Sequence, residues 1–414
     1  MKLVCPFCKS QLKCKDNDRL LCKKCGRSYK IKDRIYDFAD ENWTWVEDSP
    51  EIKTLLKLTS SHGFAKAKMS LREKYEYVFS EKRADWLFHC FSLRKNRRCL
   101  DVGSGFGSTA FPLSRWYGEV WSLEKSPERI AFQRLRKKDE GKNVFLVRCD
   151  MLTHPFPDGS FDLVCLNGVL EWAGLGKPNE NPCKTQLGLL STVEKLLKDS
   201  GCLYIGIENR FGIQYFLGAK DHEGYRFTSI LPRFVSNFFL RVFRGSRYLT
   251  YTYSYLEYKK LLRQAGFNYI DLYWVMPSYH YPLYSGKIED INGFRFCLLM
   301  TKGKRKNNFL RKMVFGLMSL KAPARFAFQF FFPEFLIFAY KKRKQGTLEQ
   351  SILRNIDAKS FFRHSGKDDT VYYYAIHKAG EEVCLVTILG NNDVVKNRTI
   401  VKRLISRNAR AHLR

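Results

Sequence analysis

The stretch from Arg98 to Ser108 constrains the fold more than any other part of the sequence. Its first part, Cys99 to Val102, is short and mostly apolar, which predicts a buried strand. Gly103, Gly105 and Gly107 follow at alternate positions, and apolar residues at helical spacing come next. Glycines let a ligand approach the backbone closely, and the start of a helix offers free NH groups. A strand, a glycine loop and a helix in this order predict an α/β fold that binds a cofactor.

Two acidic residues narrow the choice of cofactor. Glycine loops occur alike in proteins that bind nicotinamide, flavin and S-adenosylmethionine (SAM). Asp101 lies two residues before the first glycine, where its charge would repel a pyrophosphate but would suit the cationic methionine end of SAM. Glu124 closes the next predicted strand, residues 120–123, where an acid can bind ribose hydroxyls. For both residues the alternative is an ordinary acid at a strand end.

The sequence from Leu100 to Gly107 resembles the first motif of class I SAM-dependent methyltransferases, in which an acid between two apolar residues precedes three alternate glycines. Later segments agree in order: residues 144–151 with a third strand, 155–168 with a turn and fourth strand, and 202–207 with the fifth. The resemblance implies a Rossmann-like α/β domain over residues 98–301, with a mostly parallel seven-stranded sheet. The cofactor-binding residues that it implies are Asp101, Gly103, Ser104, Gly105, Gly107, Glu124, Lys125, Asp150, Met151, Asn167 and Gly168.

An insertion, residues 209–252, follows the predicted fifth strand. Ser254 and Glu257 then form a capping-box signal for a helix, and strands are expected near residues 268–276 and 294–301. Because the insertion would cover the carboxyl edge of the sheet, we expect it to form the acceptor site.

His222, which lies between two acids in the insertion, is a candidate general base for deprotonating a hydroxyl acceptor. Glu171, after the fourth strand, is a second candidate, and a solvated loop histidine is the simpler alternative for His222. The substrate-contact candidates are Trp172, Asn209 and Arg210. The insertion also resembles methyltransferases that are encoded with bacterial cell-envelope polysaccharide or lipopolysaccharide enzymes.

Two Cys-x-x-Cys pairs, Cys5 with Cys8 and Cys22 with Cys25, stand 13 residues apart near the N-terminus. Four thiolates that meet at one point suit a closed, tetrahedral structural zinc site. A thioredoxin-like redox pair, the alternative, would need one pair beside a βαβ unit. The segment, residues 1–40, is similar to Trm112-type zinc ribbons. We expect its zinc to support folding or docking, because four thiolates leave no open coordination position.

The net charge of +31 predicts an anionic partner. Residues 302–414, expected to form a basic α+β extension, carry 24 basic and 8 acidic side chains. Residues 309–344 in this extension, and residues 227–243 in the insertion, combine aromatic with basic side chains. This pattern suits the interface of an anionic membrane, and the alternatives are a buried interdomain helix and a lid helix, respectively. The alternation from Val371 predicts a β-hairpin.

Length and composition exclude several classes of protein. A chain of 414 residues with 45% hydrophobic and 15% aromatic residues is too apolar for a disordered protein. The odd count of 13 cysteines favours reduced thiols. The first residues lack the long apolar stretch that a signal peptide needs, and no uncharged run is long enough to span a bilayer. We therefore expect a cytoplasmic protein with peripheral contact to the inner membrane face, and a helical lead-in over residues 51–97.

Three functions fit these features. The first is a SAM-dependent methyltransferase that acts on a hydroxyl or similar group of a glycan, a lipid-linked intermediate or a small metabolite. The second is an RNA methyltransferase whose ribbon and basic tail bind phosphates. The third is a non-enzymatic scaffold protein with the SAM-binding fold, which the complete set from Asp101 to Glu124 argues against.

Overall fold

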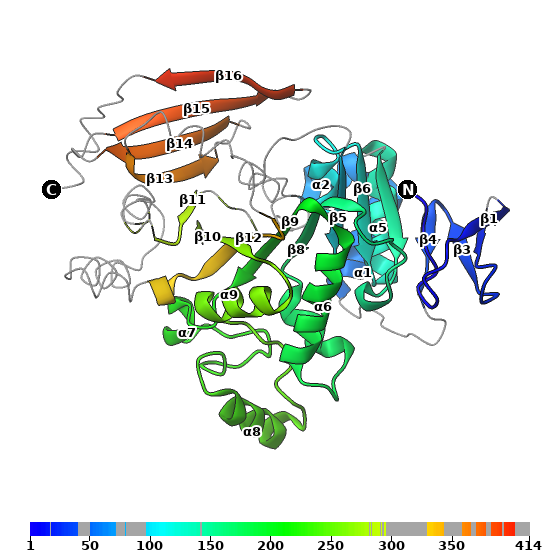
Figure 1. Cartoon of the computed structure of the whole chain (residues 1–414), viewed down its shortest axis with the longest axis horizontal. Coiled ribbons are helices and arrows are strands. Elements are labelled where there is room, and N and C mark those ends of the chain that lie inside the picture. Colours follow the sequence, from blue (N-terminus) through cyan, green and yellow to red (C-terminus); the bar gives the residue numbers. More distant parts are fainter. Residues whose placement is uncertain are drawn as a thin grey trace.

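The computed structural model describes residues 1–16, 18–39, 50–71, 97–140, 143–280, 284–289 and 329–342, four single residues (79, 282, 291 and 294), and the backbone of four strands between 358 and 401. Figure 1 shows a central sheet with helices on both faces, the N-terminal strands at one end and the last strands at the other. The described helices are α1 (Pro50–His62), α2 (Phe64–Leu71), α4 (Ala110–Leu113), α5 (Pro127–Asp139), α6 (Pro182–Leu196), α7 (Ile213–Phe216), α8 (Arg233–Arg244) and α9 (Tyr255–Gln264), with 3-10 helices η2 (Met151–Thr153), η3 (Leu170–Gly176) and η4 (Gln329–Phe331).

Seven strands form the centre of the sheet, in the order β7-β6-β5-β8-β9-β12-β10. They are β5 (Arg98–Val102), β6 (Glu119–Glu124), β7 (Val144–Arg148), β8 (Phe161–Asn167), β9 (Leu197–Glu208), β10 (Tyr269–Met276) and β12 (Glu334–Tyr340). Strands β5 to β9 pair in parallel, whereas β12 is antiparallel to both of its neighbours, β9 and β10. The chain adds β6 and β7 on one side of β5 and then crosses to β8 on the other. Ligands of such sheets bind at this reversal of strand order, beyond the carboxyl ends of the strands. The Rossmann-like fold expected from the sequence is therefore present.

Both faces of the central sheet are buried, which explains why its strands read as continuous apolar runs. In β8, Val164 and Leu166 pack in one hydrophobic core, and Leu163 and Cys165 pack in the other. Helices α6 and α9 contribute to the first core, and α4 and α5 to the second. Helices α1 and α2 pack against α5 around Phe132.

Strand β12 corrects the prediction for the aromatic segment near the C-terminus. From the sequence, residues 335–340 belonged to a segment that touches a membrane or forms a buried helix. In the structure, Phe335 to Ala339 are fully buried, and β12 pairs with β9 from Glu334↔Glu208 to Tyr340↔Cys202. A short apolar run of this kind does not distinguish a buried strand from a buried helix by its periodicity. The strand expected at 294–301 and most of residues 309–344 lie outside the described residues, as does most of the lead-in.

The N-terminal segment extends the sheet at its other edge. Strands β1 (Lys13–Asp16), β2 (Arg19–Leu21), β3 (Ser28–Lys32) and β4 (Ile35–Asp37) form an antiparallel unit. Strand β4 then pairs in parallel with the edge strand β7, and the Asp37 carboxylate lies 3.1 Å from the Arg148 guanidinium. The Val4 NH donates to the Pro155 carbonyl at 2.9 Å, and the Lys9 ammonium donates to the His154 carbonyl at 3.1 Å. The cysteine-rich segment is thus fixed to the sheet by backbone pairing as well as by side chains.

The helix after the glycine loop is shorter than the sequence suggested, because α4 covers only Ala110–Leu113. Pro112 lacks an NH group, so a helix accepts it only in its first turn, and the chain turns again before Gly118. The predicted capping box is confirmed: Ser254 and Glu257 exchange hydrogen bonds at the start of α9.

Beyond β10 the sheet continues through antiparallel strands. They are β11 (Tyr284–Lys287), β13 (Ala358–Ser365), β14 (Thr370–His377), β15 (Glu382–Gly390) and β16 (Asp393–Val401). Strands β14 and β15 pair where the sequence predicted a hairpin. Among the described helices, none combines the length and the apolar character needed to cross a bilayer.

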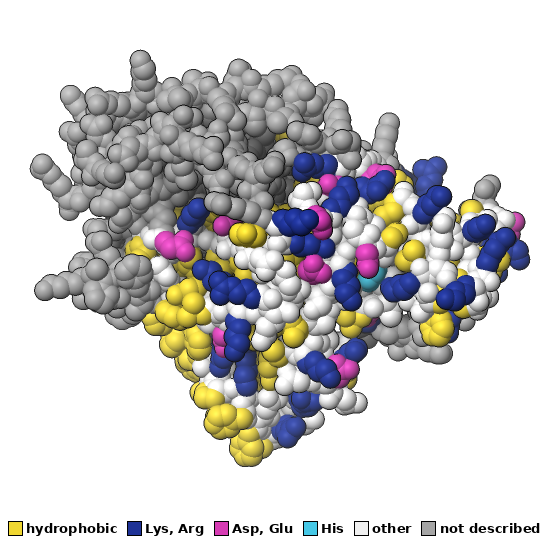
Figure 2. Space-filling view, in the orientation of Figure 1, with side chains coloured by type: hydrophobic (Ala, Val, Ile, Leu, Met, Phe, Trp, Pro, Cys, Tyr) yellow, Lys and Arg dark blue, Asp and Glu magenta, His cyan; other side chains and the backbone are white. Residues whose placement is uncertain are grey.

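Helix α8 of the insertion projects from the body of the protein (Figure 1). Its exposed apolar side chains are Phe234, Phe238, Val242 and Phe243, with Phe234 75% and Phe238 70% exposed. In Figure 2, hydrophobic side chains gather at the tip where Figure 1 places α8.

Candidate functional site

The glycine loop after β5 has the backbone conformation that its sequence requires. Gly103, Gly105 and Gly107 all have positive φ, at 58°, 57° and 77°. A side chain at Gly103 would lie 2.8 Å from Val169, so the first glycine also permits close packing against the β8 loop. Behind the loop, the Gln133 amide of α5 donates to the Gly105 carbonyl at 2.7 Å. The loop is therefore held rigidly with its backbone close to the carboxyl ends of β5 and β8.

Glu124, at the end of β6, is linked to the glycine loop by hydrogen bonds. Its carboxylate accepts the backbone NH groups of Gly105 at 2.7 Å, Lys125 at 2.7 Å and Ser126 at 2.8 Å. Burial raises the pKa of Glu124. Beside it, the Ser122 hydroxyl donates to the hydroxyl of Ser104 at 2.7 Å. The structure thus brings two of the predicted cofactor residues, Glu124 and Ser104, into one hydrogen-bonded unit with the loop.

The remaining predicted cofactor residues line the same edge of the sheet. Asp101 is buried in β5. Beyond β7, Asp150 caps η2 and forms an ion pair of 2.9 Å with Lys125, and Met151 follows it. At the end of β8, the Asn167 side chain accepts a hydrogen bond of 3.0 Å from Tyr204. Gly168 comes next with a φ of 69°, and a side chain there would lie 2.8 Å from the Tyr279 hydroxyl.

A cluster of ionisable side chains lies beside this edge. Glu171 follows β8, Glu208 ends β9, and His222 comes from the insertion. One ligand atom of each lies within 4.8 Å of the other two. The His222 Nε2 atom is 3.2 Å from Glu208 Oε2, and the Trp172 ring packs edge-on against the imidazole, with 4.8 Å between ring centroids. The two weak catalytic candidates, Glu171 and His222, therefore meet in space.

The charges in this cluster depend on one another. Burial and the negative charge of Glu208 raise the pKa of Glu171 to about 8. Burial would raise the pKa of Glu208, but the contact with His222 outweighs it and lowers that pKa. Burial would lower the pKa of His222, but Glu208 raises it to about 9. In this arrangement His222 carries a proton at neutral pH, which is not the state of a general base.

Sequence reasoning missed two residues of this site, Tyr279 and Glu334. The Tyr279 hydroxyl donates to Glu208 Oε1 at 3.0 Å, and the Tyr279 NH donates to the Glu334 carboxylate at 2.7 Å. Burial, with the charge of Glu208, raises the pKa of Glu334 to about 8. A lone acid in the apolar run at 334–340 was the available signal, but only the pairing of β12 with β9 places it beside Glu208.

Other polar residues of the insertion have structural partners. Asn209 is fully buried, and its amide donates to the carbonyls of Phe330 at 2.6 Å and Phe332 at 2.7 Å. Arg210 donates to the carbonyls of Ser229 at 3.1 Å and Leu231 at 2.8 Å. Two of the three substrate-contact candidates, Asn209 and Arg210, thus have side chains engaged with the backbone, whereas the third, Trp172, lies next to the ionisable cluster.

The two acids that flank His222 also hold the insertion together. Asp221 accepts hydrogen bonds from the hydroxyls of Thr228 at 2.7 Å and Tyr248 at 2.9 Å. Glu223 accepts the Leu249 NH at 3.1 Å. The acid that contacts the imidazole is therefore Glu208, at the end of β9, rather than either acid next to His222 in the sequence.

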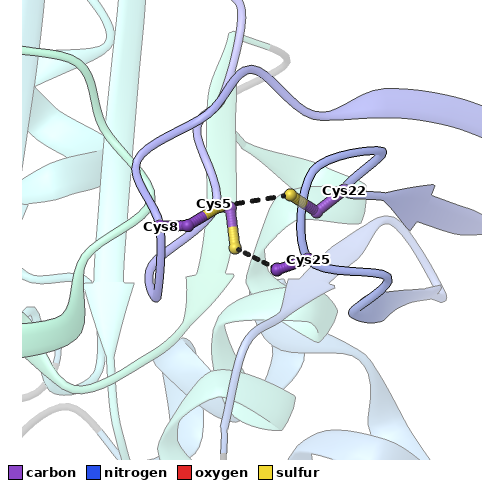
Figure 3. Close-up of side chains that lie close together, drawn as sticks. All are labelled: Cys5, Cys8, Cys22 and Cys25. Atoms are coloured by element: carbon purple, nitrogen blue, oxygen red, sulfur yellow. Dashed lines mark hydrogen bonds between the residues drawn. The ribbon is translucent and has the colours of Figure 1, made fainter.

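The four N-terminal cysteines converge (Figure 3) in the unit of β1 to β4, which lies at one end of the molecule (Figure 1). The Sγ atoms of Cys5 and Cys25 are 3.6 Å apart, and those of Cys8 and Cys22 are 3.4 Å apart. All four sulfur atoms lie within 4.8 Å of one another. This arrangement fits a metal with four thiolate ligands. Cys14 is exposed and stands apart from the cluster.

Comparison with known proteins supports the assignment of both segments. Residues 100–205 match the family described as methyltransferase domain, and residues 3–33 match that described as Trm112p-like protein. The ubiquinone/menaquinone biosynthesis C-methyltransferase UbiE of Pectobacterium carotovorum is 29% identical over 83 residues, or 19% of this chain. That match spans 33% of the relative, so the chain covers about a third of its length.

Solved structures of methyltransferases also match. Phosphoethanolamine N-methyltransferase 2 of Haemonchus contortus, in complex with phosphomonomethylethanolamine and S-adenosylhomocysteine, is 16% identical, with 70% of this chain and 60% of that chain covered and a TM-score of 0.39. A complex between the Haloferax volcanii Trm112 methyltransferase activator and a methyltransferase is 12% identical, with coverages of 70% and 98% and a TM-score of 0.36. The family matches agree with the resemblance found in the sequence: residues 100–205 carry a methyltransferase domain, and residues 3–33 carry a Trm112-like segment.

Proposed function

We propose that this protein transfers a methyl group from SAM to a hydroxyl or similar acceptor at the carboxyl edge of β5, β6, β8 and β9. The main support is that the predicted cofactor residues and the ionisable cluster converge at the carboxyl edge of the central sheet. The glycine loop, Glu124 and the cluster of Glu171, Glu208 and His222 come from four different loops, and parallel pairing brings the ends of those strands together. Val169, two residues before Glu171, packs against Gly103 and so joins the cofactor loop to the cluster.

In this proposal, Asp101 faces the cationic end of SAM and Glu124 its ribose, with Asp150 and Met151 near the adenine. SAM supplies a methyl group on a positively charged sulfur, which is already activated for transfer. The task of the protein is then to hold the acceptor in line with the methyl group and to exclude water. The insertion, which supplies His222, and the segment after β8, which supplies Trp172, would do both.

We further propose that Cys5, Cys8, Cys22 and Cys25 bind a structural zinc ion. The converging sulfur atoms fit four-thiolate coordination, and such a site leaves no position for a substrate. Zinc would then stabilise the unit of β1 to β4, whose last strand pairs with β7. The expected effect is on the stability of the sheet edge rather than on the chemistry of transfer.

The acceptor class that we favour is a glycan or lipid-linked molecule at an anionic membrane surface. Helix α8 supports this, because it exposes Phe234, Phe238, Val242 and Phe243 and also carries exposed Arg241 and Arg244. Aromatic side chains beside cations suit an anionic lipid interface. The helix belongs to the same insertion that brings His222 to the site.

A test of activity begins with SAM binding measured by calorimetry. We expect Asp101→Asn to weaken SAM binding at least 10-fold, whereas Asp199→Asn, a matched change at an exposed acid, should leave it unchanged. Equal affinities would refute the assigned cofactor site. Radiolabelled SAM incubated with a fractionated host lysate then identifies the acceptor. Label in the lipid or glycan fraction supports the proposed acceptor, and label in RNA supports an RNA methyltransferase instead, which the charge of +31 would also suit.

Membrane contact is tested separately with lipid vesicles. The wild type should co-sediment with vesicles that contain phosphatidylglycerol more than with pure phosphatidylcholine, and Phe234→Ser combined with Phe238→Ser should reduce this several-fold. Leu256→Ser, at a half-exposed apolar residue of α9, is the control. Equal sedimentation of wild type and the double variant would exclude α8 as the contact.

A further inference from the structure

The cluster of Glu171, Glu208 and His222 contains a buried carboxyl group that the described residues leave without a hydrogen bond of good geometry. Glu171 is 0% exposed, and within the described part of the chain neither of its oxygens has a hydrogen bond of good geometry, the contacts with Trp172 and with its own backbone being weak. Such a carboxyl group is costly to bury, and the protein avoids an unpaired charge by keeping Glu171 protonated, since its pKa is raised to about 8; a bound metal ion would displace that proton and the proton of His222. Its two nearest ionisable neighbours, Glu208 and His222, each direct one atom toward it, within 4.8 Å. A bound cation is the partner that all three groups share.

The second carboxylate is already oriented for such a partner. Tyr279 donates to Glu208 Oε1 at 3.0 Å and leaves Oε2 on the side of His222. Glu208 Oε2 and His222 Nε2 are 3.2 Å apart and form an ion pair when the imidazole is protonated; a metal that displaces this proton would take both atoms as ligands. Two ligands of one metal at about 2.1 Å stand at about 3 Å when adjacent and about 4 Å when opposite. The 3.2 Å between Glu208 Oε2 and His222 Nε2 lies within this range, and all three ligand atoms lie within 4.8 Å of one another.

We propose that Glu171, Glu208 and His222 form a second metal site that binds a divalent first-row transition ion, with Tyr279 positioning Glu208. One imidazole nitrogen and two carboxylate oxygens suit Mn²⁺, Fe²⁺ or Zn²⁺ better than Mg²⁺ or Ca²⁺, which prefer oxygen ligands alone. This donor set is also chemically distinct from the four thiolates near the N-terminus. Three protein ligands leave coordination positions open, unlike the closed four-cysteine site.

The site has a consequence for the acceptor that rests on the proposed function. A cation at the ends of β8 and β9 would attract an acceptor oxygen and lower the pKa of its hydroxyl, because it stabilises the negative charge that forms on loss of the proton. It would repel an ammonium acceptor. Metal binding can be measured without methyl transfer, so an experiment that refutes the metal site leaves the proposed methyltransferase activity untouched, and the reverse also holds.

The test is Mn²⁺ binding to the full-length, zinc-loaded protein, followed by electron paramagnetic resonance and calorimetry without SAM or acceptor. We expect one Mn²⁺ per chain. Glu171→Gln should weaken binding at least 100-fold, and Tyr279→Phe, which removes only a positioning hydrogen bond, about 10-fold. Glu180→Gln removes an exposed carboxylate of the surface and should leave binding unchanged.

Two results would overturn the proposal: no Mn²⁺, Fe²⁺ or Zn²⁺ binding beyond the four-cysteine site, or Mn²⁺ binding that Glu171→Gln leaves intact. Should Glu171→Gln not fold, His222→Gln replaces it, because the His222 side chain is 20% exposed and tolerates change more readily. Glu171→Met provides an independent readout. It should raise the melting temperature of the metal-free protein by removing the orphan carboxylate, and abolish the stabilisation by Mn²⁺ that the wild type shows.

Discussion

Phe338→Ala tests the most consequential correction of the sequence interpretation, the burial of β12 in the central sheet. Phe338 is fully buried, pairs with Tyr204 of β9, and packs against the rings of Tyr204 and Tyr273 with centroids 5.4 and 5.6 Å away. Truncation of a buried phenylalanine costs about 3–5 kcal/mol, from lost burial and the cavity left behind. If this segment lay exposed at a membrane interface instead, Phe338→Ala would change the free energy of unfolding in solution very little.

The expected loss is large enough for calorimetry. With an unfolding entropy of about 2 cal/mol/K per residue and a cooperative unit of about 240 residues, a loss of about 4 kcal/mol lowers the melting temperature by about 8 °C. Phe234→Ala removes the same atoms from a side chain that is 75% exposed, and should change stability by at most about 0.5 kcal/mol. Equal melting temperatures for the two variants would refute the buried strand.

Three further predictions concern the cysteine cluster, pH and the glycine loop. Cys22→Ser should release one metal ion per chain and unfold residues 1–40 while the central sheet stays folded, as measured by zinc analysis and by limited proteolysis; metal retained in full would contradict the four-cysteine site. Burial lowers the pKa of His154 to about 4 in the folded protein. Between pH 6.5 and 4, His154 is therefore protonated in the unfolded chain but not in the folded one, and the free energy of unfolding decreases as the pH is lowered. At pH 5 the loss is about 2 kcal/mol, and His154→Asn, which keeps an acceptor for the Phe156 NH, should lack this component in pH-dependent melting. Gly103→Ala should lower the melting temperature and SAM affinity, because its φ is 58° and Val169 stands 2.8 Å from the new Cβ; Gly188→Ala, in open space on helix α6, should instead stabilise by about 0.5–1 kcal/mol. Destabilisation by both glycine variants would count against the loop argument.

Features that depend only on residues close together in the sequence could be predicted from it. The strand, glycine loop and acid of residues 98–108, the capping box at Ser254 and the paired cysteines all act over a few residues. Their chemistry follows from local rules of backbone conformation and ligand type. The length of the helix at Ala110–Leu113 was not predicted, because apolar spacing alone did not show where the turn around Pro112 would end it.

The ionisable cluster was predictable only in part. Glu171 and His222 drew attention as polar residues near the fourth strand and in the insertion. Their common partner, Glu208, and its hydrogen-bond donor Tyr279 lie at the ends of separate segments. Glu334 comes from a strand that inserts between β9 and β10 after an excursion of some 60 residues. No local pattern encodes such a neighbour.

The sequence by itself predicted the kind of domain, the proposed cofactor and the cluster of four cysteines, because each prediction depends on residue types at fixed, short spacings. Only the tertiary structure decided that β4 extends the sheet at β7, that β12 completes its centre, and that two glutamates and a histidine meet at its carboxyl edge. Strand pairing brings together residues that are distant along the chain, and the free energy that selects the partners comes from burial of both sheet faces rather than from any one segment.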